Sequence, residues 1–123
     1  MDKPELRPGL GFNTLAVRAG TERSSFGEHS EAMYLTSSFV FEDAEEAARR
    51  FQNLEPGMVY SRFTNPSVQM FEARLAALEG AEDCVATASG MSAILAVCLG
   101  HLRTGDEILT TPSLFGATLQ LFE

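Results

Sequence analysis

The stretch DCVATASGMSAILAVCLGHL, residues 83–102, constrains the fold more than any other part of the chain. Residues 83–89 are mostly small and β-branched, which is typical of a short strand, and residues 91–102 are apolar almost all round, which predicts a buried helix. Gly90 separates the two segments. A buried helix directly after a strand needs further elements to cover it, so this stretch predicts an α/β protein.

The same alternation continues downstream. After a turn at Gly105, EILTT at 107–111 predicts a second strand, and FGATLQLFE at 115–123 predicts the opening of another helix. Alternating strands and helices favour a mostly parallel sheet. Because two strands make a poor sheet and no residue closes the last helix before Glu123, we expect a truncated domain, the front part of a longer sequence.

Two upstream helices are marked by their end signals. In one of them we expect Asn65 to be the N-cap and Pro66 to occupy the first helical position. Gly80 is expected to end this helix. Asp43 and Glu46 form a capping-box-like pair at the start of the other helix. We expect ion pairs Glu45–Arg49 and Glu46–Arg50, and buried faces formed by Ala44, Ala47, Ala48 and Phe51 and by Val68, Phe71, Leu75 and Leu78.

Residues 1 to about 40 hold much of the Gly, Ser, Thr and Pro, and their one regular feature is a short apolar patch at Ala32–Phe41. We expect an extended arm that packs on another subunit. The predicted division is residues 1–58, an arm and helix for inter-subunit contacts, and residues 59–123, the incomplete start of the α/β domain.

Charge and hydropathy argue against several classes of function. A net charge of -8 with a single lysine, Lys3, argues against a nucleic acid or an anionic membrane as partner. The longest apolar run, Ile94 to Leu99, is far too short to span a bilayer, so we expect a cytoplasmic protein without a membrane partner. The histidines and cysteines lack metal-ligand spacing, so we expect no metal and two buried, reduced thiols, Cys84 and Cys98.

Three features are candidates for binding a phosphorylated ligand. Ser89 and Gly90 lie where a helix starts directly after a strand, and unpaired backbone N–H groups there can bind a phosphate. Tyr60 and Arg62, two apart in a segment expected to be extended, would point the same way and could bind the same kind of group. Phe115 could stack on a flat ring. The alternatives are a tight turn, an exposed surface pair and core packing.

Three motifs carry a family resemblance: YSRFTNPS at 60–67, LAALEGAEDCVATASGMSAI at 75–94 and PSLFGATLQLF at 112–122. In this order they resemble the Cys/Met-metabolism family of enzymes that depend on pyridoxal 5'-phosphate (PLP), and the resemblance covers nearly all of the chain. It implies the N-terminal part of a fold type I, aspartate-aminotransferase-like large domain preceded by an extended arm. It also implies a homo-oligomer, a tetramer, whose active sites are shared between subunits.

The resemblance implies a role for the candidate residues. Tyr60 and Arg62 match the motif whose side chains bind the PLP phosphate of the neighbouring subunit. Gly90 and Met91 match the positions whose backbone N–H groups bind the phosphate within the same subunit, and Ser89 belongs to the same helix start.

Phe115 matches the aromatic residue that stacks on the pyridine ring. Many relatives have tyrosine there, and this departure favours the sulfhydrylase branch, in which sulfide displaces succinate from O-succinyl-L-homoserine to give homocysteine for methionine biosynthesis. Because Lys3 is remote from every motif, we expect the Schiff-base lysine beyond Glu123 and no catalytic residue in this chain. The alternatives are cystathionine γ-synthase, O-acetylhomoserine sulfhydrylase, methionine γ-lyase and a non-catalytic phosphate-binding or interaction module.

Overall fold

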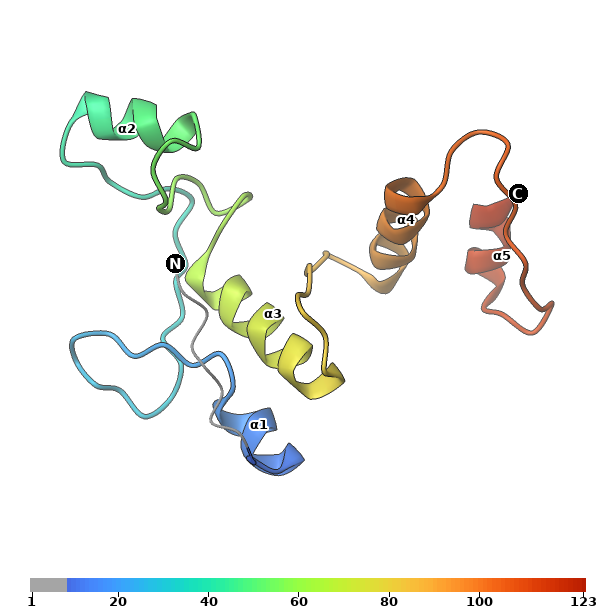
Figure 1. Cartoon of the computed structure of the whole chain (residues 1–123), viewed down its shortest axis with the longest axis horizontal. Coiled ribbons are helices and arrows are strands. Elements are labelled where there is room, and N and C mark those ends of the chain that lie inside the picture. The colour runs from blue at the N-terminus through green and yellow to red at the C-terminus, as the bar shows by residue number, and fades with distance from the viewer. Residues whose placement is uncertain (1–8) are drawn as a thin grey trace. The chain divides into compact units, whose positions relative to one another are not determined.

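The computed structural model describes residues 9–123, and the chain divides into two compact units, one ending at Val85 and the other beginning at Ala86. Between residues 9 and 123 no helix is long and apolar enough to cross a membrane. The helices of the first unit are α1 (Phe12–Arg18), α2 (Ala44–Phe51) and α3 (Pro66–Glu79), and those of the second are α4 (Gly90–His101) and α5 (Gly116–Phe122) (Figure 1).

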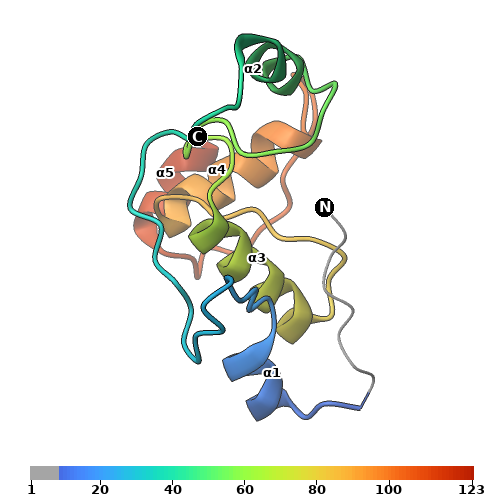
Figure 2. The same cartoon turned by 90° about the vertical axis from the view of Figure 1, so that its left-hand side faces the viewer.

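Helix α1 packs on α3 in the first unit (Figure 1 and Figure 2). Ala19, directly after α1, is 1% exposed, and Ala76 of α3 is 7% exposed. The chain just after α1 comes so close to α3 that a Cβ added at Gly20 would lie 3.0 Å from the Cβ of Ala73. The expectation of an extended arm is wrong for this stretch. Its helical signal was the spacing of Phe12, Leu15, Ala16 and Ala19 at i, i+3, i+4 and i+7.

A single arginine of α3 joins this helix pair to the loop that follows α1. The Arg74 Nε donates to the carbonyl oxygen of Ala19 at 2.9 Å, and its Nη2 donates to Thr21 Oγ1 at 3.1 Å and to the Glu31 carboxylate. A hydrogen bond from its own backbone N–H and a second from Arg74 hold the pKa of Glu31 below its ordinary value. Loop residues 19–31 are therefore held to α3 by polar contacts as well as by packing.

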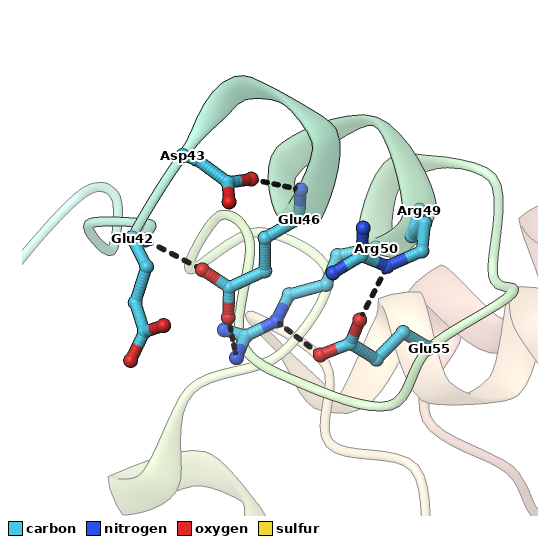
Figure 3. Close-up of polar contacts among 6 residues, drawn as sticks. All are labelled: Glu42, Asp43, Glu46, Arg49, Arg50 and Glu55. Atoms are coloured by element: carbon cyan, nitrogen blue, oxygen red, sulfur yellow. Dashed lines mark hydrogen bonds and ion pairs between the residues drawn. The ribbon is translucent and has the colours of Figure 1, made fainter.

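Helix α2 starts at the predicted cap (Figure 3). The Asp43 carboxylate accepts a hydrogen bond from the Glu46 backbone N–H at 2.7 Å, which confirms Asp43 as the N-cap. The Glu46 carboxylate accepts from the backbone N–H of Glu42 at 2.5 Å, one residue earlier than a capping box requires, and also pairs with Arg50 at 2.5 Å. The predicted i,i+4 pair between Glu46 and Arg50 is therefore confirmed.

Beyond α2, Glu55 draws both arginines of the helix toward the following loop (Figure 3). Its carboxylate lies 2.8 Å from Arg49 Nε and 3.8 Å from Arg50 Nε. Arg49 therefore pairs with Glu55, six residues on, in place of the predicted Glu45. The predicted buried face of α2 is wrong, since no residue of this helix is buried and Phe51 is exposed.

Helix α3 has the predicted ends but not the predicted buried face. Asn65 is its N-cap, Pro66 opens it, and Gly80 closes it with a left-handed φ of 65°. The buried residue of α3 is the small Ala76. Three members of the predicted stripe are exposed instead: Val68, Phe71 and Leu75.

In the second unit, α5 packs on α4, which begins after Ser89 as predicted (Figure 1). The expectation that α4 is buried is wrong, since none of its residues is buried. A helix that is apolar all round needs cover on every side, and α5 has only 7 residues to offer. Cys98 of this helix, like Cys84 in the first unit, is a free thiol that is only partly buried.

The two predicted strands, at 83–89 and 107–111, do not form. The one β-pairing among residues 9–123 is an isolated antiparallel bridge between Ser38 and Tyr60. A strand is defined by ladder hydrogen bonds to a neighbour, and the described residues provide no neighbour for either segment. Strand propensity alone therefore does not produce a sheet here.

Candidate phosphate-binding site

Tyr60 is paired with Ser38 in the β-bridge and begins a turn that contains Arg62, so the prediction of an extended segment is wrong beyond Tyr60. The Tyr60 carbonyl oxygen accepts hydrogen bonds from the backbone N–H groups of Phe63 at 2.9 Å and Thr64 at 3.1 Å. Tyr60 and Arg62 are nevertheless adjacent, because the Arg62 guanidinium carbon lies 5.0 Å from the centre of the Tyr60 ring and 5.1 Å from that of Phe63. Cation–π attraction, not strand alternation, brings the phenol and the guanidinium together.

The backbone of this turn is fixed by the segment at 36–39. The backbone N–H of Phe39 donates to the carbonyl oxygen of Val59 at 3.3 Å, and that of Ser61 donates to the carbonyl oxygen of Ser37 at 2.9 Å. The Ser61 hydroxyl also donates to the carbonyl oxygen of Thr36. The turn is thus attached on both sides of Tyr60.

The charged end of this group is available to a ligand. Tyr60 is 37% exposed, and Arg62 is exposed as well. Within the part of the chain that the structure describes, the Arg62 guanidinium contacts aromatic rings but has no carboxylate partner, so its N–H donors remain available to an anion. A guanidinium beside a phenol, both on an anchored turn, suits a phosphate, which accepts several charge-assisted hydrogen bonds.

The second candidate group is the N-terminus of α4. The Ser89 hydroxyl accepts a hydrogen bond from the Ser92 backbone N–H at 3.1 Å and lies 2.8 Å from the Ser92 hydroxyl. The backbone N–H groups of Gly90 and Met91 have no partner among residues 9–123. Nothing lies within 4 Å of where a Cβ on Gly90 would be, so the backbone there can be approached closely. Two free N–H groups at a helix start fit an anion such as phosphate.

Phe115 lies at the start of α5, which contacts the first turn of α4 through Thr118. Phe115 is the N-cap of α5, and its carbonyl oxygen accepts from the Thr118 backbone N–H at 2.8 Å. The Thr118 hydroxyl lies 3.8 Å from the sulfur of Met91, in the first turn of α4. Phe115 itself is 72% exposed, so the core-packing alternative does not hold within this unit.

The six predicted residues form two groups, Tyr60 with Arg62 in the first unit and Ser89, Gly90, Met91 and Phe115 in the second. Sequence reasoning missed Thr118 as the link between α4 and α5. It recognised Asn65 only as a helix cap, although Asn65 also contacts the turn. No group of three or more His, Cys, Asp and Glu between residues 9 and 123 could hold a metal ion.

Comparison with known proteins shows the family to which this chain belongs. The chain matches the family model for the Cys/Met metabolism PLP-dependent enzymes over residues 13–123, and it belongs to this family. A similar solved structure is that of a Campylobacter jejuni protein assigned as an O-acetylhomoserine (thiol)-lyase, which carries N'-pyridoxyl-lysine-5'-monophosphate. The match has a TM-score of 0.83 and 29% identity, and it covers 93% of this chain and 28% of that one. The fold is therefore part of a fold type I PLP-dependent enzyme, and PLP is the cofactor.

Two curated relatives are similar to this chain over most of its length. The chain is 57% identical over 94% of its length to the O-succinylhomoserine sulfhydrylase of Pseudomonas aeruginosa. It is 40% identical over 90% of its length to an L-methionine gamma-lyase of Fusobacterium nucleatum. In both cases it spans 28% of the relative's length.

Proposed function

We propose that this chain is the N-terminal segment of a PLP-dependent O-succinylhomoserine sulfhydrylase. The enzyme would replace the succinate of O-succinyl-L-homoserine by sulfide at Cγ and so form homocysteine for methionine biosynthesis. The observation that carries the proposal is the 57% identity to such an enzyme, against 40% to a methionine gamma-lyase over a similar stretch. Phe115 also supports the proposal. A phenyl ring can stack on a cofactor but, unlike the tyrosine of many relatives, cannot exchange a proton, and this departure favours the sulfhydrylase branch.

The described residues would hold the phosphate group of PLP. When PLP is bound, the cofactor supplies an electron sink for removal of the γ-substituent. The free N–H groups of Gly90 and Met91, with the Ser89 hydroxyl beside them, would bind it within the subunit. Arg62 and Tyr60 would bind the phosphate of a neighbouring subunit, in a homo-oligomer, a tetramer. One unpaired guanidinium then supplies the positive charge that a chain of net charge -8 otherwise lacks at this point.

Covalent attachment of PLP would need a lysine side chain. The single lysine of this chain, Lys3, precedes all three motifs, so the proposal assigns the Schiff-base lysine to sequence beyond Glu123. The described residues accordingly bind and orient the cofactor and do not themselves carry out proton transfer at the substrate.

A second candidate activity uses O-acetyl-L-homoserine as the acyl substrate. It is favoured by the structural match to the Campylobacter jejuni protein, although at 29% identity. The two activities differ only in the acyl group that leaves, and both place sulfide at Cγ. The residues that contact the acyl group determine which of the two esters is the preferred substrate.

The proposed function is tested by comparing substrates on the purified full-length enzyme loaded with PLP. O-succinyl-L-homoserine, O-acetyl-L-homoserine and L-methionine are supplied in turn with sulfide, and homocysteine and 2-oxobutyrate are quantified. We expect kcat/KM for homocysteine formation to be higher with the succinyl ester than with the acetyl ester by roughly tenfold or more, the lower end of the discrimination that pocket contacts supply. Faster release of 2-oxobutyrate from methionine would contradict the proposal, and absence of bound PLP would favour a non-catalytic module.

A further inference from the structure

We propose that Asn65 and Ser61 are positioning residues, which hold the turn at 60–63 so that Tyr60 and Arg62 are presented together to a phosphate. The inference rests on the proposed function of that pair. Neither Tyr60 nor Arg62 is buried, yet the residue between them is fixed by several hydrogen bonds. The order of this turn therefore comes from its backbone and from Ser61, not from the two side chains that meet the ligand.

Both the oxygen and the nitrogen of the Asn65 side-chain amide form hydrogen bonds, and Asn65 is only 6% exposed. Its Oδ1 accepts from the backbone N–H of Ser67 at 2.9 Å, which caps α3. Its Nδ2 donates to the carbonyl oxygen of Tyr34 at 3.0 Å and to the Ser61 hydroxyl at 2.9 Å. One buried side chain thus joins the segment at Tyr34, the turn and the start of α3.

Ser61 occupies the middle of the Tyr60–Arg62 pair. Its hydroxyl accepts from Asn65 and donates to the carbonyl oxygen of Thr36, and its backbone N–H donates to the carbonyl oxygen of Ser37. Both its hydroxyl and its N–H are therefore committed. A residue held in this way fixes the directions in which its two neighbours leave the backbone.

The identity of the cap supports a role beyond helix capping. Asn, Asp and Ser cap helices about equally well, because capping needs only an acceptor oxygen. Donation to Tyr34 and Ser61 at once uses both hydrogens of the amide NH2 group, whereas an ionised Asp has no donor and Ser has a single hydroxyl hydrogen on a shorter side chain. A site that is fixed before its ligand arrives spends less binding free energy on ordering, so this amide would raise phosphate affinity without touching the phosphate.

The test uses Asn65→Ser in the full-length enzyme, with Asp43→Ser as the matched control. Both changes keep an oxygen acceptor at a helix N-cap, but only the first removes bridging donors. We expect hydrogen exchange of the peptide covering 59–64 in the PLP-free enzyme to become faster in Asn65→Ser alone. We expect its PLP affinity, from reconstitution titrations, to fall roughly fivefold to tenfold, the scale of one hydrogen bond of ordinary strength.

A double-mutant cycle separates positioning from general damage. Ser61→Ala removes the acceptor of the same bridge, so the loss of PLP affinity in Asn65→Ser combined with Ser61→Ala should be clearly smaller than the product of the two single losses. Fully multiplicative losses, or unchanged exchange of the 59–64 peptide in Asn65→Ser, would overturn the positioning role.

Arg62→Ala distinguishes failure of this inference from failure of the proposed function. If Arg62→Ala weakens PLP binding while Asn65→Ser leaves it unchanged, the phosphate role stands and the positioning role is wrong. If Arg62→Ala has no effect but Asn65→Ser still loosens the turn and couples to Ser61→Ala in exchange, the positioning of the turn stands and its assignment to phosphate binding is wrong.

Discussion

At the scale of single residues, Gly20 is a position where an added methyl group would collide with a helix. It has a left-handed φ of +72°, and a Cβ there would lie 2.6 Å from the carbonyl oxygen of Met70 and 3.0 Å from the Cβ of Ala73. Both are parts of α3, whose helical backbone cannot yield. Gly27 has a similar φ of +66°, but nothing lies within 4 Å of its Cβ position.

This contrast predicts two different costs of substitution by alanine. Gly27→Ala should lower the free energy of unfolding by about 1 to 2 kcal/mol, the cost of left-handed backbone in a non-glycine residue. Gly20→Ala should add to this roughly 1 to 3 kcal/mol, because the methyl group must push α1 away from α3. Urea unfolding of the full-length protein measures both, and equal losses in the two variants would show that the α1–α3 contact is not as close as described.

At the scale of elements, the sequence predicted where helices begin and end better than which of their residues are buried. Asn65 and Ser89 cap the helices that follow them as expected, because capping depends only on residues within the same turn. The first helix was missed, since its stripe of Phe12, Leu15 and Ala16 is short and lies in a stretch rich in Gly, Ser and Thr. The predicted strands and the burial of α4 failed because both depend on partners distant in sequence, which local patterns do not specify.

For the candidate site, the sequence predicted which residues belong to it more fully than how they are arranged. The adjacency of Tyr60 and Arg62 was expected from strand alternation, whereas it arises from a cation–π contact at a turn. The free N–H groups at the start of α4 followed directly from a glycine at a helix start, since that argument is local. Residues that act through contacts distant in sequence, such as Asn65 with Tyr34, gave no sequence signal beyond the cap.

The start of α5 carries a prediction about cofactor stacking. Phe115 is exposed and lies one turn before Thr118, which contacts Met91. If its ring stacks on PLP, Phe115→Ala in the full-length enzyme should lower PLP affinity by roughly threefold to tenfold, the range for an aromatic pair, and alter the absorbance of the bound cofactor. Phe115→Tyr keeps the ring and should preserve both properties. An alanine variant with unaltered absorbance and affinity would rule out stacking.

At the scale of the whole molecule, the proposed phosphate site is shared between subunits. Tyr60 and Arg62 belong to one compact unit, and Gly90 and Met91 belong to the other. The proposal assigns the two groups to the same kind of phosphate but in different subunits. An active site of this kind would explain why a free guanidinium lies on an anchored and exposed turn.

The most direct test of this account is PLP binding and activity in mixed oligomers. Arg62→Ala alone should weaken PLP binding by about 1.5 to 3 kcal/mol, the scale of a charge-assisted hydrogen bond. Mixing these subunits with subunits that keep Arg62 but lack the Schiff-base lysine should restore part of the activity, because an intact arginine then reaches a pocket with an intact lysine. Unchanged PLP affinity in Arg62→Ala, or no recovery on mixing, would contradict phosphate binding across the subunit interface.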